Sequence, residues 1–223
     1  MGTTNKTKLP DHIRHLCIEG VIGAGKTSLC HLLRPRLDAR LVLENAEENP
    51  FLSKFYENRR NLAFQTQLWF LVQRYRQLSE AFVQQDLFHP VTMADYSFAK
   101  DRIFASVNLD DDELALYDTV ARALSRDIPR PDLIVFLQAS TDVLLKRISK
   151  RGRSYESRMD RRYLEALIEA YNHFFFHYTE SPVLVINTSD IDFVDRPGDL
   201  DVLLEQIVRV KPGVNFFHPV SSK

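Results

Sequence analysis

The sequence has little of three things that mark specialised classes of protein: cysteine, excess charge of one sign, and long apolar runs. It holds 2 cysteines among 223 residues, too few for a disulfide framework, so we expect Cys17 and Cys30 to be buried, reduced thiols. The formal net charge is -1, which leaves no excess of positive charge to neutralise a nucleic-acid backbone. No apolar run is long enough to cross a bilayer, and the first ten residues lack the apolar core of a signal peptide. We therefore expect a cytoplasmic protein of small-molecule chemistry, with no nucleic-acid or membrane partner.

The composition is that of an ordinary soluble domain. Hydrophobic residues make up 44% of the chain and charged residues 26%, and the length suits one sizeable α/β domain. We expect a single domain over residues 1–223, with flexible ends at 1–10 and 212–223. The last segment carries Phe216 and Phe217 but no pattern that predicts a strand or a helix.

Strands and helices are predicted to alternate along the chain. Five short apolar stretches without strict alternation are typical of strands covered on both faces; they are residues 15–18, 41–43, 91–94, 133–137 and 183–186. Helical periodicity covers residues 29–37, 62–82, 114–124, 141–149, 161–178 and 201–208. The acidic run Asp110 to Glu113 is interpreted as the start of a helix rather than a metal site. The alternation predicts an α/β fold of three layers, with a five-stranded parallel sheet and helices on both faces.

Ligands of such sheets bind beyond the carboxyl ends of the strands. Glu19, Glu44 and Asp95 stand at or near three predicted strand ends, so their side chains are expected to point into one crevice. The same crevice receives a glycine-rich loop.

That loop is the strongest motif in the sequence. Gly20-x-x-x-x-Gly25-Lys26-Thr27 follows a predicted strand and precedes a predicted helix, as a phosphate-binding loop requires. Glycines let successive backbone amides point at phosphates, and the helix presents the positive end of its dipole to them. Lys26 should reach the β- and γ-phosphates of ATP, and the Thr27 hydroxyl should coordinate Mg²⁺. The residues expected to bind ATP here are Gly20, Ile22, Gly23, Ala24, Gly25, Lys26, Thr27 and Ser28.

Further polar residues occur in a characteristic order. Glu44 closes the run 41–44, and Tyr56 is followed by Gln67 after eleven residues and by Arg74 after seven more. Asp95-Tyr96-Ser97 precedes the run 100–105, an arginine-rich segment spans 147–156, and a polar turn spans 187–193. Gln67 and Arg74 lie two helical turns apart and so share one helix face.

From about Ile18 to Phe193 the chain thereby resembles the deoxyribonucleoside kinases, the family of deoxycytidine and deoxyguanosine kinases and their bacterial relatives. The mammalian-type enzymes have a proline directly after the glutamate that corresponds to Glu44, whereas this chain has Asn45. In this respect the chain is similar to the bacterial branch. The resemblance implies the P-loop kinase fold with an arginine-rich lid, and a homodimer paired through long helices.

The resemblance also implies a role for each site residue. It implies that Glu44 takes the proton from the sugar 5′-hydroxyl, and that Asp95 joins Thr27 in organising Mg²⁺. The residues implied to bind the nucleoside are Tyr56 and Glu156 at the 3′-hydroxyl, and Gln67, Arg74, Asp101 and Phe104 at the base. The residues implied to bind ATP or its transferring phosphoryl group are Arg147, Arg151 and Arg153 in the lid, and Asp192 and Phe193 in a loop that holds the adenine.

One position departs from the family pattern. The family usually has an arginine after the acidic residue that corresponds to Asp95, and this chain has Tyr96. Lys100 and Arg102, one turn later, are the candidate substitutes for the missing cation.

The predicted reaction is in-line transfer of the γ-phosphoryl group from Mg·ATP to the 5′-hydroxyl of a deoxyribonucleoside. Gln67 and Arg74 favour a purine, deoxyadenosine or deoxyguanosine, and leave deoxycytidine open. Two alternatives share the phosphate loop. A nucleoside monophosphate kinase similar to thymidylate kinase would need cations for its acceptor's phosphate, whereas this chain offers Glu44 and Glu156. A P-loop ATPase or regulatory nucleotide-binding module would have no use for Glu44 or the lid arginines.

Overall fold

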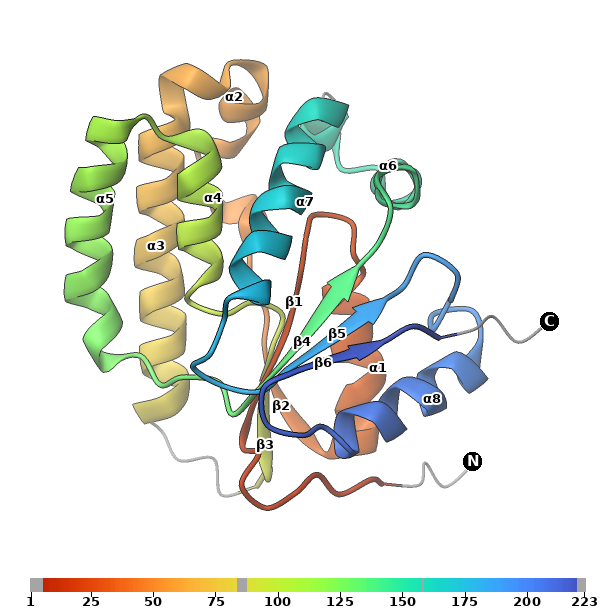
Figure 1. Ribbon diagram of the computed structural model, residues 1–223. Helices are drawn as coiled ribbons and strands as arrows, with labels where there is room; N and C mark the ends of the chain where they lie inside the picture. The colour runs from red at the N-terminus through yellow and green to blue at the C-terminus, as the bar shows by residue number, and fades with distance from the viewer. Residues whose placement is uncertain (1–5, 84–87, 158, 220–223) are drawn as a thin grey trace.

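The computed structural model describes residues 6–83, 88–157 and 159–219. Its centre is a sheet of six parallel strands in the order β2-β3-β1-β4-β5-β6 (Figure 1). The strands are β1 His15–Gly20, β2 Ala39–Val42, β3 Val91–Ala94, β4 Leu133–Gln138, β5 Val183–Asn187 and β6 Val214–Phe217. Every residue of β1 is buried, which explains why its apolar residues do not alternate strictly with polar ones.

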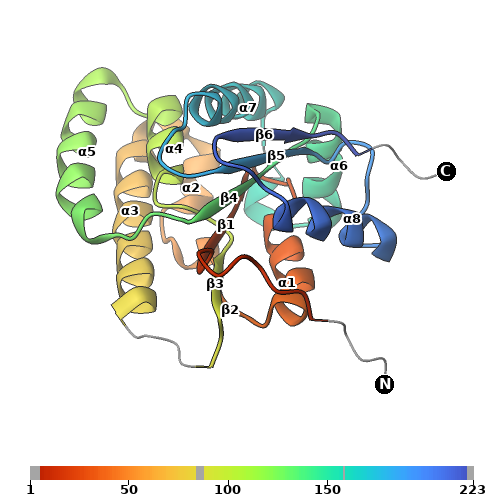
Figure 2. The same cartoon turned by 60° about the horizontal axis from the view of Figure 1, so that its bottom comes forward.

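Helices connect the strands and cover both faces of the sheet. They are α1 Lys26–Leu37, α2 Leu52–Glu57, α3 Arg59–Val83, α4 Lys100–Asn108, α5 Asp111–Leu124, α6 Thr141–Arg151, α7 Arg161–Phe176 and α8 Pro197–Val208. Three short 3-10 helices are η1 Ala46–Glu48, η2 Ser125–Asp127 and η3 Ser154–Glu156. Figures 1 and 2 show α1 and α8 on one face, and α7 with α3 and α4 on the other, with α5 outermost on that side. The predicted three-layer α/β fold is confirmed.

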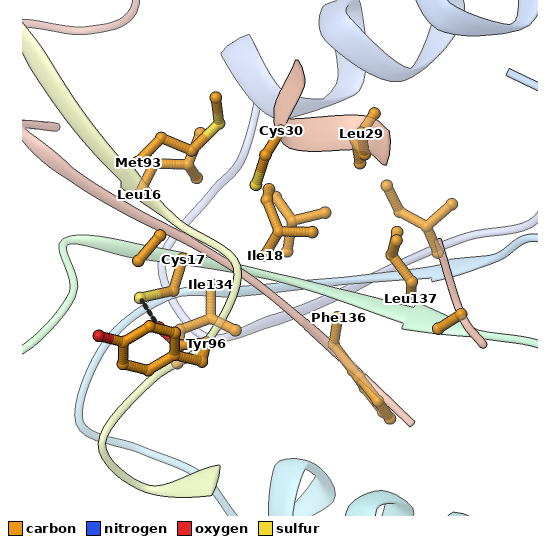
Figure 3. Packing of buried hydrophobic residues seen from close by; sticks show 14 of the residues in the cluster. Leu16, Cys17, Ile18, Leu29, Cys30, Met93, Tyr96, Ile134, Phe136 and Leu137 are labelled. Carbon is orange, nitrogen blue, oxygen red and sulfur yellow. Dashed lines mark hydrogen bonds between the residues drawn. The ribbon is translucent and has the colours of Figure 1, made fainter. Parts of the chain in front are cut away.

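The core lies on both sides of β1 and β4. Figure 3 shows Leu29 and Cys30 of α1 on one side of the sheet and Phe136 and Tyr96 on the other. All four side chains are at most 1% exposed. Cys17 and Cys30 are free and buried, as predicted, because both belong to this apolar interior.

The sheet has one strand more than the five predicted. β6 pairs with β5 in parallel, with Val183 beside Val214. It is an edge strand whose residues are at best half-buried, and Phe216 is 59% exposed. An edge strand of four residues carries no continuous apolar run, so the sequence pattern did not predict it.

β6 lies within residues 212–223, which were expected to be a flexible end. At the other end of the chain, Leu9 is buried and the Thr7 amide donates to the Arg36 carbonyl at 2.7 Å. Residues 1–5 and 220–223 of the two expected ends lie outside the described residues.

The prediction about the acidic run is confirmed. Asp110 caps α5 by accepting a hydrogen bond from the Glu113 amide at 2.9 Å, and the Glu113 side chain accepts one from the Asp110 amide. This reciprocal pair is a capping box.

Two helices, α2 and α4, were not predicted, and α4 holds residues of the candidate site.

Candidate active site

The phosphate loop joins β1 to α1 at the carboxyl edge of the sheet. Gly25 has φ of 98°, a left-handed conformation that glycine adopts at little cost. A Cβ at Gly20 would come within 2.6 Å of the Leu137 carbonyl oxygen, so the loop approaches β4 too closely for any side chain there. No side chain caps the N-terminus of α1, and its first turn has no acidic residue. The first amides of α1 are therefore available to an anion such as phosphate.

Lys26 is half-buried at the start of α1 and is held by the loop itself. Its Nζ donates to the carbonyls of Gly20 at 2.8 Å and Val21 at 3.1 Å. Burial, with the nearby charge of Lys100, lowers the pKa of Lys26 to about 8. The other predicted loop residues, Ile22, Gly23, Ala24, Thr27 and Ser28, lie in the same turn and the first turn of α1.

Asp95 connects the loop to the second predicted catalytic position. Its Oδ2 accepts a hydrogen bond from the Thr27 hydroxyl, and its Oδ1 accepts one from the Glu44 amide at 2.8 Å. A hydroxyl beside a carboxylate at a phosphate loop fits Mg²⁺, which binds through one or two protein oxygens together with waters and phosphate oxygens. Among the described residues there is no cluster of three or more His, Cys, Asp or Glu suited to a metal ion.

Glu44 follows β2 and forms ion pairs with two cations. Arg74 of α3 donates to Glu44 Oε1 from Nε at 2.8 Å and from Nη2 at 2.5 Å, and Lys100 of α4 donates to Glu44 Oε2. Burial disfavours the carboxylate, but the charges of Arg74 and Lys100 outweigh it and hold the pKa of Glu44 well below its usual range. Glu44 is therefore an anion at neutral pH, ready to accept a hydrogen bond from a hydroxyl.

Arg74 also pairs with Asp101, with Nη1 and Oδ1 2.5 Å apart. Both side chains are almost fully buried, and burial raises the pKa of Asp101 to about 6 despite the charge of Arg74. Both Asp101 oxygens, the Gln67 Oε1 and the Tyr117 hydroxyl are buried without an aligned hydrogen bond. Buried polar atoms are normally satisfied, so these unpaired atoms of Gln67, Asp101 and Tyr117 are available to a polar ligand.

Tyr56 of α2 lies near η3, which carries Tyr155 and Glu156. The Tyr56 ring stacks on Tyr155, with ring centroids 6.0 Å apart. Burial raises the pKa of Tyr56, and the nearby Glu156 carboxylate adds to the shift. Phe104 of α4 lies between Lys100, at 5.8 Å from its ring centroid, and Tyr171 of α7.

The lid arginines contact protein groups in this structure. Arg147 donates to the Thr188 carbonyl at 2.9 Å and to the Ala24 carbonyl at 3.3 Å, so it ties α6 to the phosphate loop and to the segment after β5. Arg151 donates to Glu156 at 2.6 Å, and Arg153 pairs with Glu47 at 3.1 Å.

The predicted adenine loop packs against the phosphate loop. Phe193 is buried, and a Cβ at Gly25 would lie 3.0 Å from its ring. Asp192 closes the turn after β5 by accepting hydrogen bonds from the amides of Val194 and Asp195, each at 3.1 Å.

Glu19 and Tyr96 have positions that the sequence did not reveal. Glu19 does not face the crevice, because it is fully buried and accepts hydrogen bonds from the Ser97 amide at 2.6 Å and hydroxyl at 2.7 Å. It thereby holds the segment that carries Asp95. Tyr96 is also fully buried, and its hydroxyl donates to Gln77 at 2.8 Å. The charge of Glu19 beside a strand end suggested a crevice residue, and only the packing distinguishes the two roles.

Known proteins share this architecture. The family model described as deoxynucleoside kinase matches residues 16–210. The deoxyguanosine kinase of Bacillus subtilis is 39% identical over 193 residues, 83% of this chain and 92% of that protein. A deoxyadenosine kinase of Lactobacillus acidophilus is 28% identical, covering 87% of this chain and 95% of that protein. The structure of deoxyadenosine kinase from M. mycoides with bound dCTP shares the fold, with a TM-score of 0.74 at 24% identity, over 86% of this chain and 98% of that one. The chain belongs to the deoxynucleoside kinase family.

Proposed function

We propose that this protein transfers the γ-phosphoryl group of Mg·ATP to the 5′-hydroxyl of a deoxyribonucleoside. One observation carries the proposal: Glu44 is linked through Asp95 to Thr27 of the phosphate loop. An acceptor hydroxyl on Glu44 would thus lie at the same strand edge as the phosphates of a donor on Lys26. Bringing two reactants together in this way is the main task of a phosphoryl-transfer enzyme.

The reaction forms one bond and breaks another. The 5′-oxygen forms a bond to the γ-phosphorus, the bond from that phosphorus to the β–γ bridging oxygen breaks, and ADP leaves. The hydroxyl proton passes to Glu44. Because the pKa of Glu44 is depressed, this carboxylate chiefly orients the hydroxyl and accepts the proton late in the transfer.

Other residues bind and orient the substrates. Lys26 and the first amides of α1 hold the donor phosphates, while Arg147, Arg151 and Arg153 close over them. Mg²⁺, held by Thr27 and Asp95, would supply positive charge to the phosphate oxygens. Residues 192–193 border the adenine site. Water is excluded where η3 of the lid segment packs on α2.

The nucleoside is bound between α2, α3 and α4. Tyr56 and Glu156 bind the sugar 3′-hydroxyl, and Phe104 packs beside the base. Gln67, Arg74 and Asp101 offer an amide and an ion pair to the base edge. This set, and relatives named as deoxyguanosine and deoxyadenosine kinases, support a purine as the preferred base.

The test uses the full chain with Mg·ATP and each of the four deoxyribonucleosides, scored chromatographically for the 5′-monophosphate. We expect deoxyguanosine or deoxyadenosine to give the highest kcat/KM, and Lys26→Met to abolish product formation. Consumption of ATP without any nucleoside monophosphate would overturn the proposal. Turnover of deoxycytidine alone would overturn only the purine preference.

The proposal extends to the assembly and place of the enzyme. A homodimer and a cytoplasmic role in nucleotide salvage follow from the family resemblance, and light scattering after gel filtration tests the dimer. Within the described residues, none of the helices combines the length and apolar character needed to span a membrane.

A further inference from the structure

The acceptor side of the site has a buried lysine in an unusual place. Lys100 is the first residue of α4 and is 4% exposed. The N-terminus of a helix carries partial positive charge, so a cation there is disfavoured. Burial of an ammonium group adds a further cost unless a carboxylate pairs with it. The ion pair between Lys100 and Glu44 meets that requirement and places the ammonium group beside the proposed proton acceptor.

Lys100 also lies close to the donor side. The hydrogen bonds from Thr27 to Asp95 and from the Glu44 amide to Asp95 join the two sides. Lys100 is thus linked through Glu44 and Asp95 to Thr27 of the phosphate loop.

Neighbouring side chains do not supply a cation at this point. Tyr96, directly after Asp95, is fully buried and bonds Gln77. Arg102 points to the other side of α4, where its Nε pairs with Asp118 at 2.7 Å, and its side chain is 46% exposed. Arg74 contacts Glu44 as well, but its guanidinium also pairs with Asp101, with Nη1 and Oδ1 2.5 Å apart. The charge of Arg74 is therefore divided between two carboxylates.

We propose that Lys100 supplies the acceptor-side positive charge of the transfer, holding the Glu44 carboxylate toward the 5′-hydroxyl and facing the transferring phosphoryl group. This inference rests on the proposed function. The ammonium group would shorten its distance to the phosphoryl oxygens as negative charge spreads over them, which is the form of catalysis that phosphoryl transfer requires. Of the two candidate substitutes for the arginine that Tyr96 replaces, the proposal therefore selects Lys100 and not Arg102.

The test compares three variants of the full enzyme with Mg·ATP and its best nucleoside. Lys100→Met keeps the length of the side chain and removes the charge, Lys100→Arg keeps the charge, and Arg102→Met is the matched control on the same helix. We expect Lys100→Met to lower kcat by about 100-fold or more, the usual effect of losing one transition-state donor. The KM for nucleoside should change by less than about fivefold, because that donor acts chiefly in the transition state. Lys100→Arg should recover most of kcat, and Arg102→Met should resemble the wild type.

Stability is measured in parallel by thermal unfolding. If Lys100→Met does not fold, Lys100→Gln and Lys100→Arg provide the same comparison of neutral and charged side chains. A folded neutral variant with wild-type kcat, or equal losses in the arginine and neutral variants, would overturn the proposal while the kinase function stood. A wild-type enzyme that makes no nucleoside monophosphate would overturn both the function and the role of Lys100.

Discussion

Replacing Glu44 by glutamine tests the proposed proton acceptor with a minimal change in the shape of the side chain. The carboxylate accepts hydrogen bonds from Arg74 at 2.5 and 2.8 Å and an ion pair from Lys100. Glutamine keeps one acceptor oxygen but cannot take a proton. We expect Glu44→Gln to lower kcat by about 100-fold or more, the usual contribution of a general base, which corresponds to about 2.7 kcal/mol of activation free energy.

Binding and folding should respond differently from turnover. The phosphate loop holds Lys26 through its own carbonyls, so the Kd for ATP should change by less than about twofold, well below 1 kcal/mol. The free energy of unfolding should fall by roughly 1–3 kcal/mol, because Lys100 loses its charged partner while buried.

The assay measures initial rates at saturating ATP and nucleoside, with ATP affinity from calorimetry and stability from denaturant unfolding. Glu48→Gln is the matched control, since Glu48 is an exposed glutamate on η1 whose carboxylate accepts only a local hydrogen bond from Asn45 at 2.6 Å. A folded Glu44→Gln enzyme with wild-type kcat would refute the assignment of Glu44 as the proton acceptor.

Three further predictions concern the sugar, the loop and acid stability. Tyr56 and Glu156 crowd the sugar, so kcat/KM for the deoxyribonucleoside should exceed that for the matching ribonucleoside by at least about tenfold, or 1.4 kcal/mol; equal values would contradict this. Gly25→Ala places a Cβ 3.0 Å from Phe193 at a φ of 98° and should weaken ATP binding measurably, with strain of about 1–2 kcal/mol in the loop; unaltered calorimetric affinity would show that the loop tolerates it. Burial lowers the pKa of His15 from 6.5 to about 4, so stability is retained above pH 6.5 and is lost as the pH falls toward 4, by up to about 3 kcal/mol. His15→Gln should flatten that part of a denaturant-derived stability curve, and an unchanged slope would rule His15 out as its source.

The regular parts of the fold were predictable because burial on both faces leaves a direct trace in sequence. β1 and β4 lie in the middle of the sheet, where every residue of β1 is buried and five of the six residues of β4 are apolar and buried. The phosphate loop was predictable because its glycines stand between a strand and a helix. β6 left no such trace, because it occupies the edge and is exposed on one side. α4 was also not predicted, since it is nine residues long and begins with two buried charges.

The candidate site also has parts that the sequence predicted and parts that it did not. Glu44, Asp95 and Thr27 could be placed together from the rule that ligands bind at the carboxyl edge of parallel strands. The pairing of Lys100 with Glu44, and the separation of Arg102 from it, depends on where α4 begins and how it turns. One residue's shift along a helix rotates a side chain by about 100°, and the periodicity of the sequence did not define that start. The contacts of the lid arginines likewise depend on tertiary packing.

The central claim is that the γ-phosphoryl group of ATP passes to a 5′-hydroxyl. The most direct measurement supplies ATP labelled in its γ-phosphoryl group with either deoxyguanosine or its 5′-deoxy analogue, which lacks that hydroxyl. The account predicts labelled nucleoside monophosphate with deoxyguanosine and none with the analogue. Label released only as free phosphate, at the same rate with both, would contradict it.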